Sequence, residues 1–502
     1  MSEEAAIAPS GVFRAPSTWL VAVKLALVRD VPALSVDGFR VAAGLVVLAY
    51  FARHLAEVGL YHGPDGLVPH EVSREVFPFT VEPLFALVGR SALAVRAVYA
   101  GACALSVLLV LGVRPRLVAF ALYLVAVATY RHDFLVMGVD DVLVHLALFW
   151  LTLLPTGATL TLEERAGGLR TTLERWRGAR VRGTMVRLFL ANLGLLYFVA
   201  GASKWTSPMW RSGEALFAVL SLPMSHVAEA MRPTLAPWLR AGTYATLFVE
   251  PLLPLGIALS SDARVRRALV VSVVVLHLSI VATVDVPFAN LLCLAAIPLY
   301  FRHVKRAPKS TRAVRMRPSE IFASAVVGTL AAAMASAFVT PPWRAPELDG
   351  PRGKAALVRG ATAETGGATQ TALFGALFAV GLVQQYRLLD WIDDRNFAVE
   401  VTVHTSGAHP EIVPFARVAP RDMRSSILLG YLGGVTWMPI AEEHAPKVRE
   451  AIAERLGARA CRALPGATEL TIEANFRRTG LPDVAPTRHV VLAAHACTEE
   501  AR

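Results

Sequence analysis

The segment from Leu195 to Phe217 (LLYFVAGASKWTSPMWRSGEALF) contains residue types that can do acid–base chemistry. It places Lys204, Trp205 and Trp210 directly after a run of apolar residues. A charged amine at such a place is costly, so Lys204 either extends its amine to the interface or loses its proton through desolvation. Only in the second case is it a general base near neutral pH. The two tryptophans are either interfacial aromatic residues or part of the same site.

Other polar residues lie within or beside apolar stretches. His277 lies in the middle of one, where a functional role and a packed role are both open. Arg131, His132 and Asp133 are expected to face the exterior, where they could receive an anionic group of a substrate. The histidines occur singly, without HExxH or His-x-His spacing, so the sequence predicts no metal site.

The composition indicates the kind of element that must position these residues. Of 502 residues, 55% are hydrophobic and only 18% are charged, and the mean hydropathy is +0.49. This composition predicts a polytopic membrane protein that is embedded in the lipid bilayer. Lysine and arginine exceed aspartate and glutamate by 50 to 39, an excess of 11 positive charges. In a membrane protein this excess belongs in short cytoplasmic loops, so nucleic-acid binding is not implied.

Nine apolar stretches are candidate transmembrane helices. They are Phe39–Leu60, Ser91–Val113, Leu117–Val136, Val139–Leu154, Val186–Ser203, Tyr244–Leu259, Leu269–Val284, Val286–Phe301 and Ile321–Val339. Arg40 and Arg53 begin and end the apolar part of the first stretch, which is ordinary for interfacial arginines. The basic residues concentrate in alternate connections, which predicts an N-terminus inside and a C-terminus outside.

The sequence therefore divides into four parts. Residues 1–36 form a cytoplasmic segment with an amphipathic helix near Trp19–Val28, and residues 37–340 form the transmembrane domain. Residues 341–390 are expected to form an outer loop and a surface helix at Thr371–Trp391. Residues 391–502 predict a small α+β domain outside the membrane. Its expected elements are a hairpin of Phe397–Thr405 and Glu411–Phe415, a helix at Lys447–Leu456 and a strand at Glu469–Phe476.

The chain contains four cysteines without a CxxC pair, which excludes a thiolate zinc site. Cys461 and Cys497 both lie in the predicted outer domain. In an oxidising compartment they could form a disulfide, but two thiols that never meet are equally compatible with the sequence.

Several motifs resemble the HTTM superfamily, which includes the vitamin K-dependent γ-glutamyl carboxylase. Ala200-Gly201, Lys204, Trp210 and Gly213 resemble the family signature AG..K.....W..G. Further similar segments are Asp37–Arg40, Tyr61–Pro69 (YHGPDGLVP), Phe149–Gly157 (FWLTLLPTG), His277 with Pro287-Phe288, Gln385–Trp391 and Val399–Pro414. The resemblance covers most of residues 37–415 and implies nine helices with the C-terminus outside, as the loop charges do.

The resemblance implies a function as well. Lys204 would be the base that deprotonates reduced vitamin K or menaquinol, so that oxygen can react and carbon dioxide can be added to a substrate carbanion. Trp205, Trp210, Arg131, His132 and His277 would bind the quinone or the substrate. We therefore expect a bacterial inner-membrane enzyme that carboxylates, or oxidatively modifies, a secreted peptide or protein, without a metal cofactor.

Two departures from the family pattern leave a second function open. The Asn-His pair at the start of the fourth helix is replaced by Val139 and Asp140. Asp140 and Asp141 either orient a quinol hydroxyl, pair with Lys204 or cap the helix, and His145, one turn below, either replaces the missing histidine or is simply buried. The roughly 110 residues after Asp390 are also too few for the carboxylase's large outer domain. The alternative is a non-enzymatic membrane factor for maturation or export of a secreted peptide.

Overall fold

The structure is a computed structural model that describes most of the predicted transmembrane domain and part of the C-terminal tail. The described residues are 27–77, 82–162, 169–205, 207–227, 231–259, 262–300, 316–339, 382, 395–405, 410–433, 444–478 and 488–497. The predicted helix at residues 19–28, the loop at 341–367 and the surface helix at 371–391 lie outside these residues, apart from positions 27, 28 and 382.

The chain is mostly helical, and each of the nine apolar stretches contains a helix. These are α2 (Ala33–Ala56), α5 (Ala92–Leu111), α6 (Pro115–His132), α7 (Val139–Leu153), α9 (Thr184–Lys204), α12 (Arg232–Leu259), α13 (Ala263–Thr283), the pair α14 (Pro287–Ala295) and α15 (Ile297–Tyr300), and α16 (Pro318–Val339). In the described part of the chain, four helices are long enough and apolar enough to cross a membrane, namely α2, α5, α9 and α13. Shorter apolar helices cover Pro287–Tyr300 and Pro318–Ala332.

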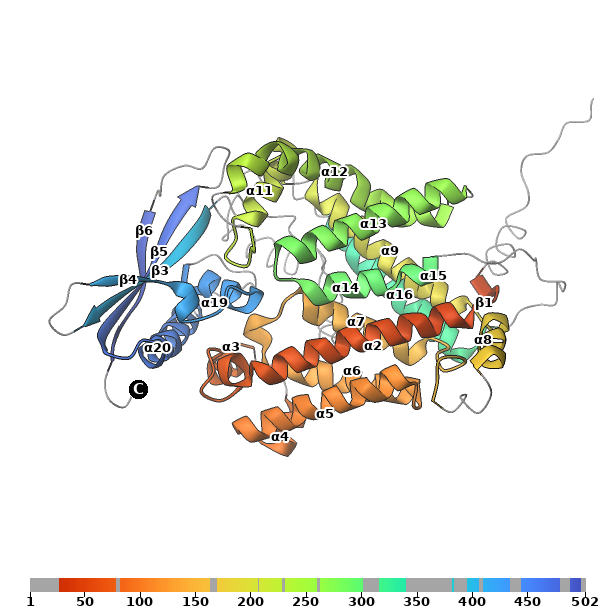
Figure 1. Cartoon of the computed structure of the whole chain (residues 1–502), viewed down its shortest axis with the longest axis horizontal. Coiled ribbons are helices and arrows are strands. Elements are labelled where there is room, and N and C mark those ends of the chain that lie inside the picture. Colours follow the sequence, from red (N-terminus) through yellow and green to blue (C-terminus); the bar gives the residue numbers. More distant parts are fainter. Residues whose placement is uncertain are drawn as a thin grey trace, which may run out of the picture.

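Helix α2 runs the length of the bundle and packs against α5 and α14 (Figure 1). At its start, Asp37 and Arg40 form a completely buried ion pair of 3.0 Å. Asp37 accepts a hydrogen bond from the Thr159 backbone N–H (2.8 Å), and Arg40 donates to the carbonyl oxygens of Leu109 (2.6 Å) and Leu160 (2.8 Å). Arg40 is therefore not the interfacial arginine that its position suggests. It joins α2 to two other segments and satisfies backbone groups that are otherwise buried.

Short elements occupy the two ends of the bundle (Figure 1). The end that carries the C-terminal domain has η1 (Val58–His62), α3 (His70–Val76), α4 (Pro83–Val88), η2 (Phe134–Val136), α10 (Pro208–Ser212) and α11 (Ala215–Leu220). The opposite end has α8 (Leu169–Gly178) and the short antiparallel pair β1 (Val31–Pro32) and β2 (Arg180–Val181). The candidate site residues lie toward the first of these ends.

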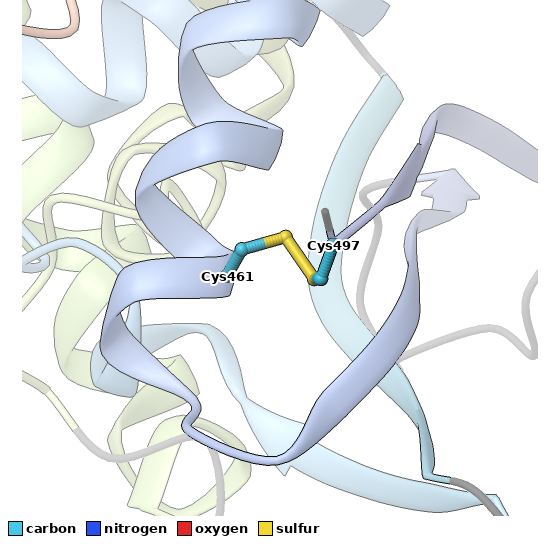
Figure 2. The surroundings of a disulfide bond; sticks show 2 residues. All are labelled: Cys461 and Cys497. Atoms are coloured by element: carbon cyan, nitrogen blue, oxygen red, sulfur yellow. A yellow bond between two sulfur atoms is a disulfide. The ribbon is translucent and has the colours of Figure 1, made fainter. Parts of the chain in front are cut away.

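The C-terminal domain is an antiparallel four-stranded sheet with two helices. Its sheet has the order β4-β3-β5-β6, from β3 (Arg395–Thr405), β4 (Glu411–Pro414), β5 (Ala467–Arg478) and β6 (Arg488–Ala496). Helices α19 (Met423–Gly433) and α20 (Ala445–Ala463) lie between the sheet and the helical bundle, and η6 (Phe415–Arg417) follows β4 (Figure 1). A disulfide joins Cys461 on α20 to Cys497, directly after β6 (Figure 2).

The predicted elements of this domain are largely present. The hairpin pairs Val401 with Val413, and the strand predicted at residues 469–476 is the central part of β5. The helix predicted at residues 447–456 is longer, because α20 continues to Ala463. Helix α19 and strand β6 were not predicted. The sequence of α19 (MRSSILLGYLG) has no amphipathic period, because nearly every side chain of this helix is buried.

Helix α19 docks on the bundle through an apolar core and a charged layer. Ile427, Leu428 and Tyr431 of α19 share one buried core with Tyr61 of η1 and Leu135 of η2. The C-terminal domain therefore does not have a separate core, and its position on the helix ends is fixed by apolar packing.

Candidate functional site

Lys204 is the last residue of α9, and a glycine one turn earlier sets its surroundings. A Cβ atom on Gly201 would lie 2.6 Å from the backbone nitrogen of Pro251 in α12, so only glycine allows the two helices to come this close. Proline at 251 also leaves no N–H to be satisfied at this contact. The close approach places Glu250 of α12 beside Lys204.

The Lys204 amine is buried and fully engaged. The residue is 4% exposed, and Nζ donates to Glu250 Oε2 at 2.7 Å and to the carbonyl oxygen of Ala200 at 3.2 Å. The same nitrogen lies 5.2 Å from the centre of the Trp210 ring, within the range of a cation–π interaction. Lys204 therefore does not extend to the solvent, and its partner is a carboxylate from another helix.

The two tryptophans have different positions. Trp210 is 1% exposed and covers the Lys204 amine. Trp205 is 42% exposed, donates its indole N–H to the carbonyl oxygen of Leu247 at 3.1 Å and packs edge-on against Phe248. Trp210 is thus a wall of the lysine site, whereas Trp205 lies on the outside of α12 like an interfacial tryptophan.

Glu250 is the residue that sequence reasoning missed. It lies within the apolar run Tyr244–Leu259, where an ionisable residue is costly and is therefore a functional candidate with a partner to be found. The signal was present, because Glu250 is the only acidic residue of that stretch. What the sequence does not give is the pairing, since Lys204 and Glu250 are 46 residues apart.

His277 joins the same region from α13. Its side chain is buried and hydrogen-bonds to the Tyr197 hydroxyl of α9 through one ring nitrogen and to Asn290 Oδ1 of α14 (2.7 Å) through the other. The Glu250 carboxylate interacts electrostatically with Tyr197 and His277, and also with Cys293. We refer to Lys204, Glu250, Tyr197, His277, Asn290 and Cys293 as the Lys204 cluster.

Asp140 and Asp141 do not pair with Lys204. Asp141 accepts a hydrogen bond from the Tyr50 hydroxyl at 2.5 Å and caps its own helix, α7, by accepting from the Gly138 N–H at 2.7 Å. Asp140 accepts from the Ala289 N–H at 2.7 Å and so caps α14. Capping is favourable because the first N–H groups of a helix lack partners and carry a positive dipole end.

His145 is also remote from the cluster by its contacts. It is 1% exposed, its Nε2 contacts the carbonyl oxygen of Ala126 at 3.0 Å, and its ring packs edge-on against Tyr130. These contacts join α7 to α6. They favour the packed interpretation of this histidine over a replacement for the histidine that the family pattern requires.

A second polar layer lies under α19. Arg53 forms a bidentate pair with Asp285 (2.9 and 2.8 Å), and the Met423 N–H donates to the same carboxylate at 3.2 Å. Arg424 reaches Glu57 at 3.1 Å, His54 at 2.6 Å and Asp141 at 3.7 Å. A small cavity in this layer is lined by residues that include Arg53, Asp140, Asp141, Asp285 and Arg424. This layer connects the C-terminal domain to the ends of α2, α7 and α13.

Arg131 and His132 are the last two residues of α6. Arg131 is half-buried near the end of α6. His132 is 2% exposed and Asp133 is 7% exposed, and both turn inward to other histidines. These two side chains are therefore buried and not exposed to solvent, and a role in receiving an anionic group of a substrate stays a prediction. The structure does not bring them into contact with Lys204.

The comparisons with known proteins leave the family resemblance resting on the motifs alone. Neither a protein family, nor a curated protein, nor a solved structure matches the chain.

Proposed function

We propose that the chain is a nine-span integral membrane protein of a bacterial inner membrane, with its C-terminal domain periplasmic or extracellular. The four long apolar helices, the helices within the other apolar stretches and the alternating loop charges support this topology. The Cys461–Cys497 disulfide supports an oxidising compartment for the C-terminal domain. A membrane-impermeant maleimide should label Asp65→Cys in intact cells and Arg177→Cys only after permeabilisation. The reverse pattern would contradict the topology.

We further propose a quinol- and oxygen-dependent enzyme that carboxylates, or oxidatively modifies, a secreted substrate at the Lys204 cluster. The observation that carries this proposal is the buried contact of 2.7 Å between the Lys204 amine and the Glu250 carboxylate. General-base catalysis needs a base held within hydrogen-bond reach of the quinol hydroxyl, and we take the paired amine and carboxylate as the candidate base. Glu250 holds the Lys204 amine in place at a position that is buried from water.

The polar atoms of the cluster fit the headgroup of reduced vitamin K or menaquinol by chemical type. The Lys204 amine and the Glu250 carboxylate provide a donor and an acceptor, and the buried Trp210 provides a flat apolar wall. When bound, the quinol would supply the reducing equivalents with which oxygen reacts. Tyr197 and His277 are hydrogen-bonded to each other and extend the polar cluster from α9 to α13. Overall, quinol, oxygen, carbon dioxide and a C–H substrate would give quinone epoxide, water and a carboxylated substrate.

The test is oxygen-dependent quinol oxidation by the full chain in lipid nanodiscs, with vitamin K hydroquinone and menaquinol as probes. We expect Lys204→Ala to lower the rate by about 100-fold or more, as loss of a general base does. Lys447→Ala is the matched control, because this lysine is exposed and its partner Glu75 lies outside the cluster. Incorporation of labelled carbon dioxide into glutamate-containing peptides would then separate carboxylation from oxidation alone. Equal rates for the wild type and Lys204→Ala with both quinols would overturn the proposal.

The same ion pair favours a second candidate, a non-enzymatic factor for maturation or export of a secreted peptide. On this alternative, the ion pair holds α9 against α12 and takes no part in a reaction. In that case the double variant Lys204→Met/Glu250→Leu, which removes both charges together, would keep the biological activity of the protein.

A further inference from the structure

Four buried titratable side chains that the proposed function does not use gather beside the end of α6. His62 ends η1, His70 begins α3, and His132 ends α6 just before Asp133. They are 0%, 3%, 2% and 7% exposed, in that order. The His70 and His132 rings are stacked with centres 3.9 Å apart. Three segments that are distant in sequence therefore bring imidazoles and a carboxylate into one buried place.

Hydrogen bonds to the backbone decide which ring nitrogens are available. Nδ1 of His70 lies 2.9 Å from the carbonyl oxygen of His132, and Nε2 of His132 lies 3.1 Å from the carbonyl oxygen of His62. A carbonyl oxygen only accepts, so both of these nitrogens carry hydrogen. The opposite nitrogen of each neutral ring then has a lone pair. Contacts of this kind are the ones that orient metal-binding histidines in proteins.

The remaining polar atoms of these side chains are without hydrogen bonds. Among the described residues, His70 Nε2, His132 Nδ1 and Asp133 Oδ1 are buried and have no hydrogen-bond partner. The other oxygen of Asp133 accepts from the Tyr99 hydroxyl at 2.7 Å. Buried polar atoms without partners are costly, and several acceptors that face one another also repel. A cation between them removes both costs.

The spacing suits a small cation. One ligand atom from each of His70, His132 and Asp133 lies within 4.8 Å of the others. Bonds of about 2.1 Å in tetrahedral geometry separate ligand atoms by about 3.4 Å, so the side chains need to move by little more than an ångström. Glu82 is a candidate for a fourth ligand, because its Oε1 is also without a hydrogen bond and lies 3.5 Å from His132 Nδ1. His62 is a second candidate, because its Nδ1 is without a hydrogen bond and lies 2.9 Å from Asp133 Oδ2.

We propose that His70, His132 and Asp133, with Glu82 or His62 as a further ligand, form a buried binding site for a divalent transition metal ion such as Zn²⁺. Two imidazoles and one or two carboxylates suit zinc and its first-row neighbours, whereas Ca²⁺ and Mg²⁺ prefer sites made of oxygen atoms only. The ion would join α3 to the end of α6, directly beneath the C-terminal domain. Single histidines in a sequence do not predict this site, because its ligands come from separate segments.

The test uses the full chain, purified in detergent with a tag that contains no histidine from cells grown with added zinc. We expect about one zinc ion per chain by elemental analysis, and a Co²⁺ absorption spectrum typical of nitrogen and oxygen ligands after exchange. The double variant His70→Ala/His132→Ala should contain background metal only. The matched control is His145→Ala, which removes another buried histidine of the same region and should keep the metal.

A second measurement does not depend on the folding of the ligand variants. Tyr99→Phe removes only the hydroxyl that orients Asp133, so the metal affinity should fall by roughly 10-fold while the ligands remain. Zinc added to chelator-treated wild-type protein should also raise its thermal midpoint. If the wild type binds neither Zn²⁺ nor Co²⁺, or if the double variant binds as much metal as the wild type, the proposal is wrong.

Discussion

Gly201 of α9 lies against Pro251 of α12 at a distance that no side chain permits. A Cβ atom at this glycine would be 2.5 Å from Pro251 Cδ and 2.6 Å from its nitrogen. Because Glu250 precedes this proline, the close approach is also what places the carboxylate within reach of Lys204. The glycine and the lysine of one short motif therefore have linked roles, the first in helix packing and the second in the site.

We expect Gly201→Ala to separate α9 from α12. Overpacking at a helix contact costs about 1–3 kcal/mol, and the lysine site is lost with the contact. Gly101→Ala in α5 is the matched control, since a Cβ there meets nothing within 4 Å. The midpoint of thermal unfolding in detergent and the rate of quinol oxidation should both fall for Gly201→Ala only. Equal behaviour of the two variants would mean that the helix approach is not what holds the site.

The Lys204–Glu250 pair predicts strong non-additivity. Removing one partner of a buried ion pair leaves an uncompensated charge and costs about 3–5 kcal/mol, whereas replacing both by apolar residues is often nearly neutral. Lys204→Met and Glu250→Leu should each be much less stable than the double variant. Denaturant unfolding of the four proteins measures this coupling. Additive losses would show that the pair is not a unit.

The charged layer under α19 predicts how firmly the C-terminal domain is held. Arg424→Ala removes the positive partner of the partly buried Glu57 and Asp141 and so weakens the contact of α19 with the bundle. The amide hydrogens of α19 should therefore exchange much faster. Lys447→Ala should have little effect, because exposed ion pairs contribute little to stability. Hydrogen exchange of residues 423–433 compares the two. If the amide protection of α19 is unchanged in Arg424→Ala, apolar contacts alone hold this helix on the bundle.

Asp285 gives the same interface a dependence on pH. Burial raises the pKa of its carboxyl group, but the hydrogen bonds and the charge of Arg53 outweigh burial and hold this pKa below its usual value of 3.8. A group whose pKa is lowered by folding stabilises the folded state at pH values above its unfolded-state pKa. This stabilisation is lost as the pH falls through its folded-state pKa. The stability difference between the wild type and Asp285→Asn should therefore be full near pH 7 and shrink below about pH 3.8. A difference that is constant across that range would contradict this.

The extent to which the sequence predicted these features depended on the range of the interactions. Apolar runs and strand alternation are local signals, so the helix positions and the hairpin at Val401 and Val413 were predictable. Pairings across helices are not local. Arg40 was expected at an interface, because its bonds to the distant carbonyl oxygens of Leu109 and Leu160 cannot be read from its own helix. The pairing of Glu250 with Lys204 joins two helices in the same way.

The histidines show the same limit more sharply. His70 and His132 are 62 residues apart and have no spacing that indicates a shared site. Their rings meet only because the segments around η1 and after α6 fold over the same helix end. His132 and Asp133 thus turn inward, although they follow an apolar helix in a position that is normally exposed.

The Cys461–Cys497 disulfide closes a loop of 36 residues between α20 and the end of β6. In the chain-entropy model, a loop of this length contributes roughly 4 kcal/mol by restricting the unfolded chain. Cys497→Ser, or mild reduction of the wild type, should therefore lower the unfolding midpoint of the protein, with the sheet of the C-terminal domain becoming sensitive to protease first. Circular dichroism and proteolysis at the sheet would report these two effects separately.

The remaining cysteines provide the control for that measurement. Cys293 is buried and Cys103 is half-buried, and neither is bonded to another cysteine. Protein denatured under an alkylating agent should therefore carry two labels per chain before reduction and four after it. Cys103→Ser should remove one label without changing the stability of the C-terminal domain. Four labels without reduction would mean that Cys461 and Cys497 are not joined, and the oxidising location proposed for this domain would lose its support.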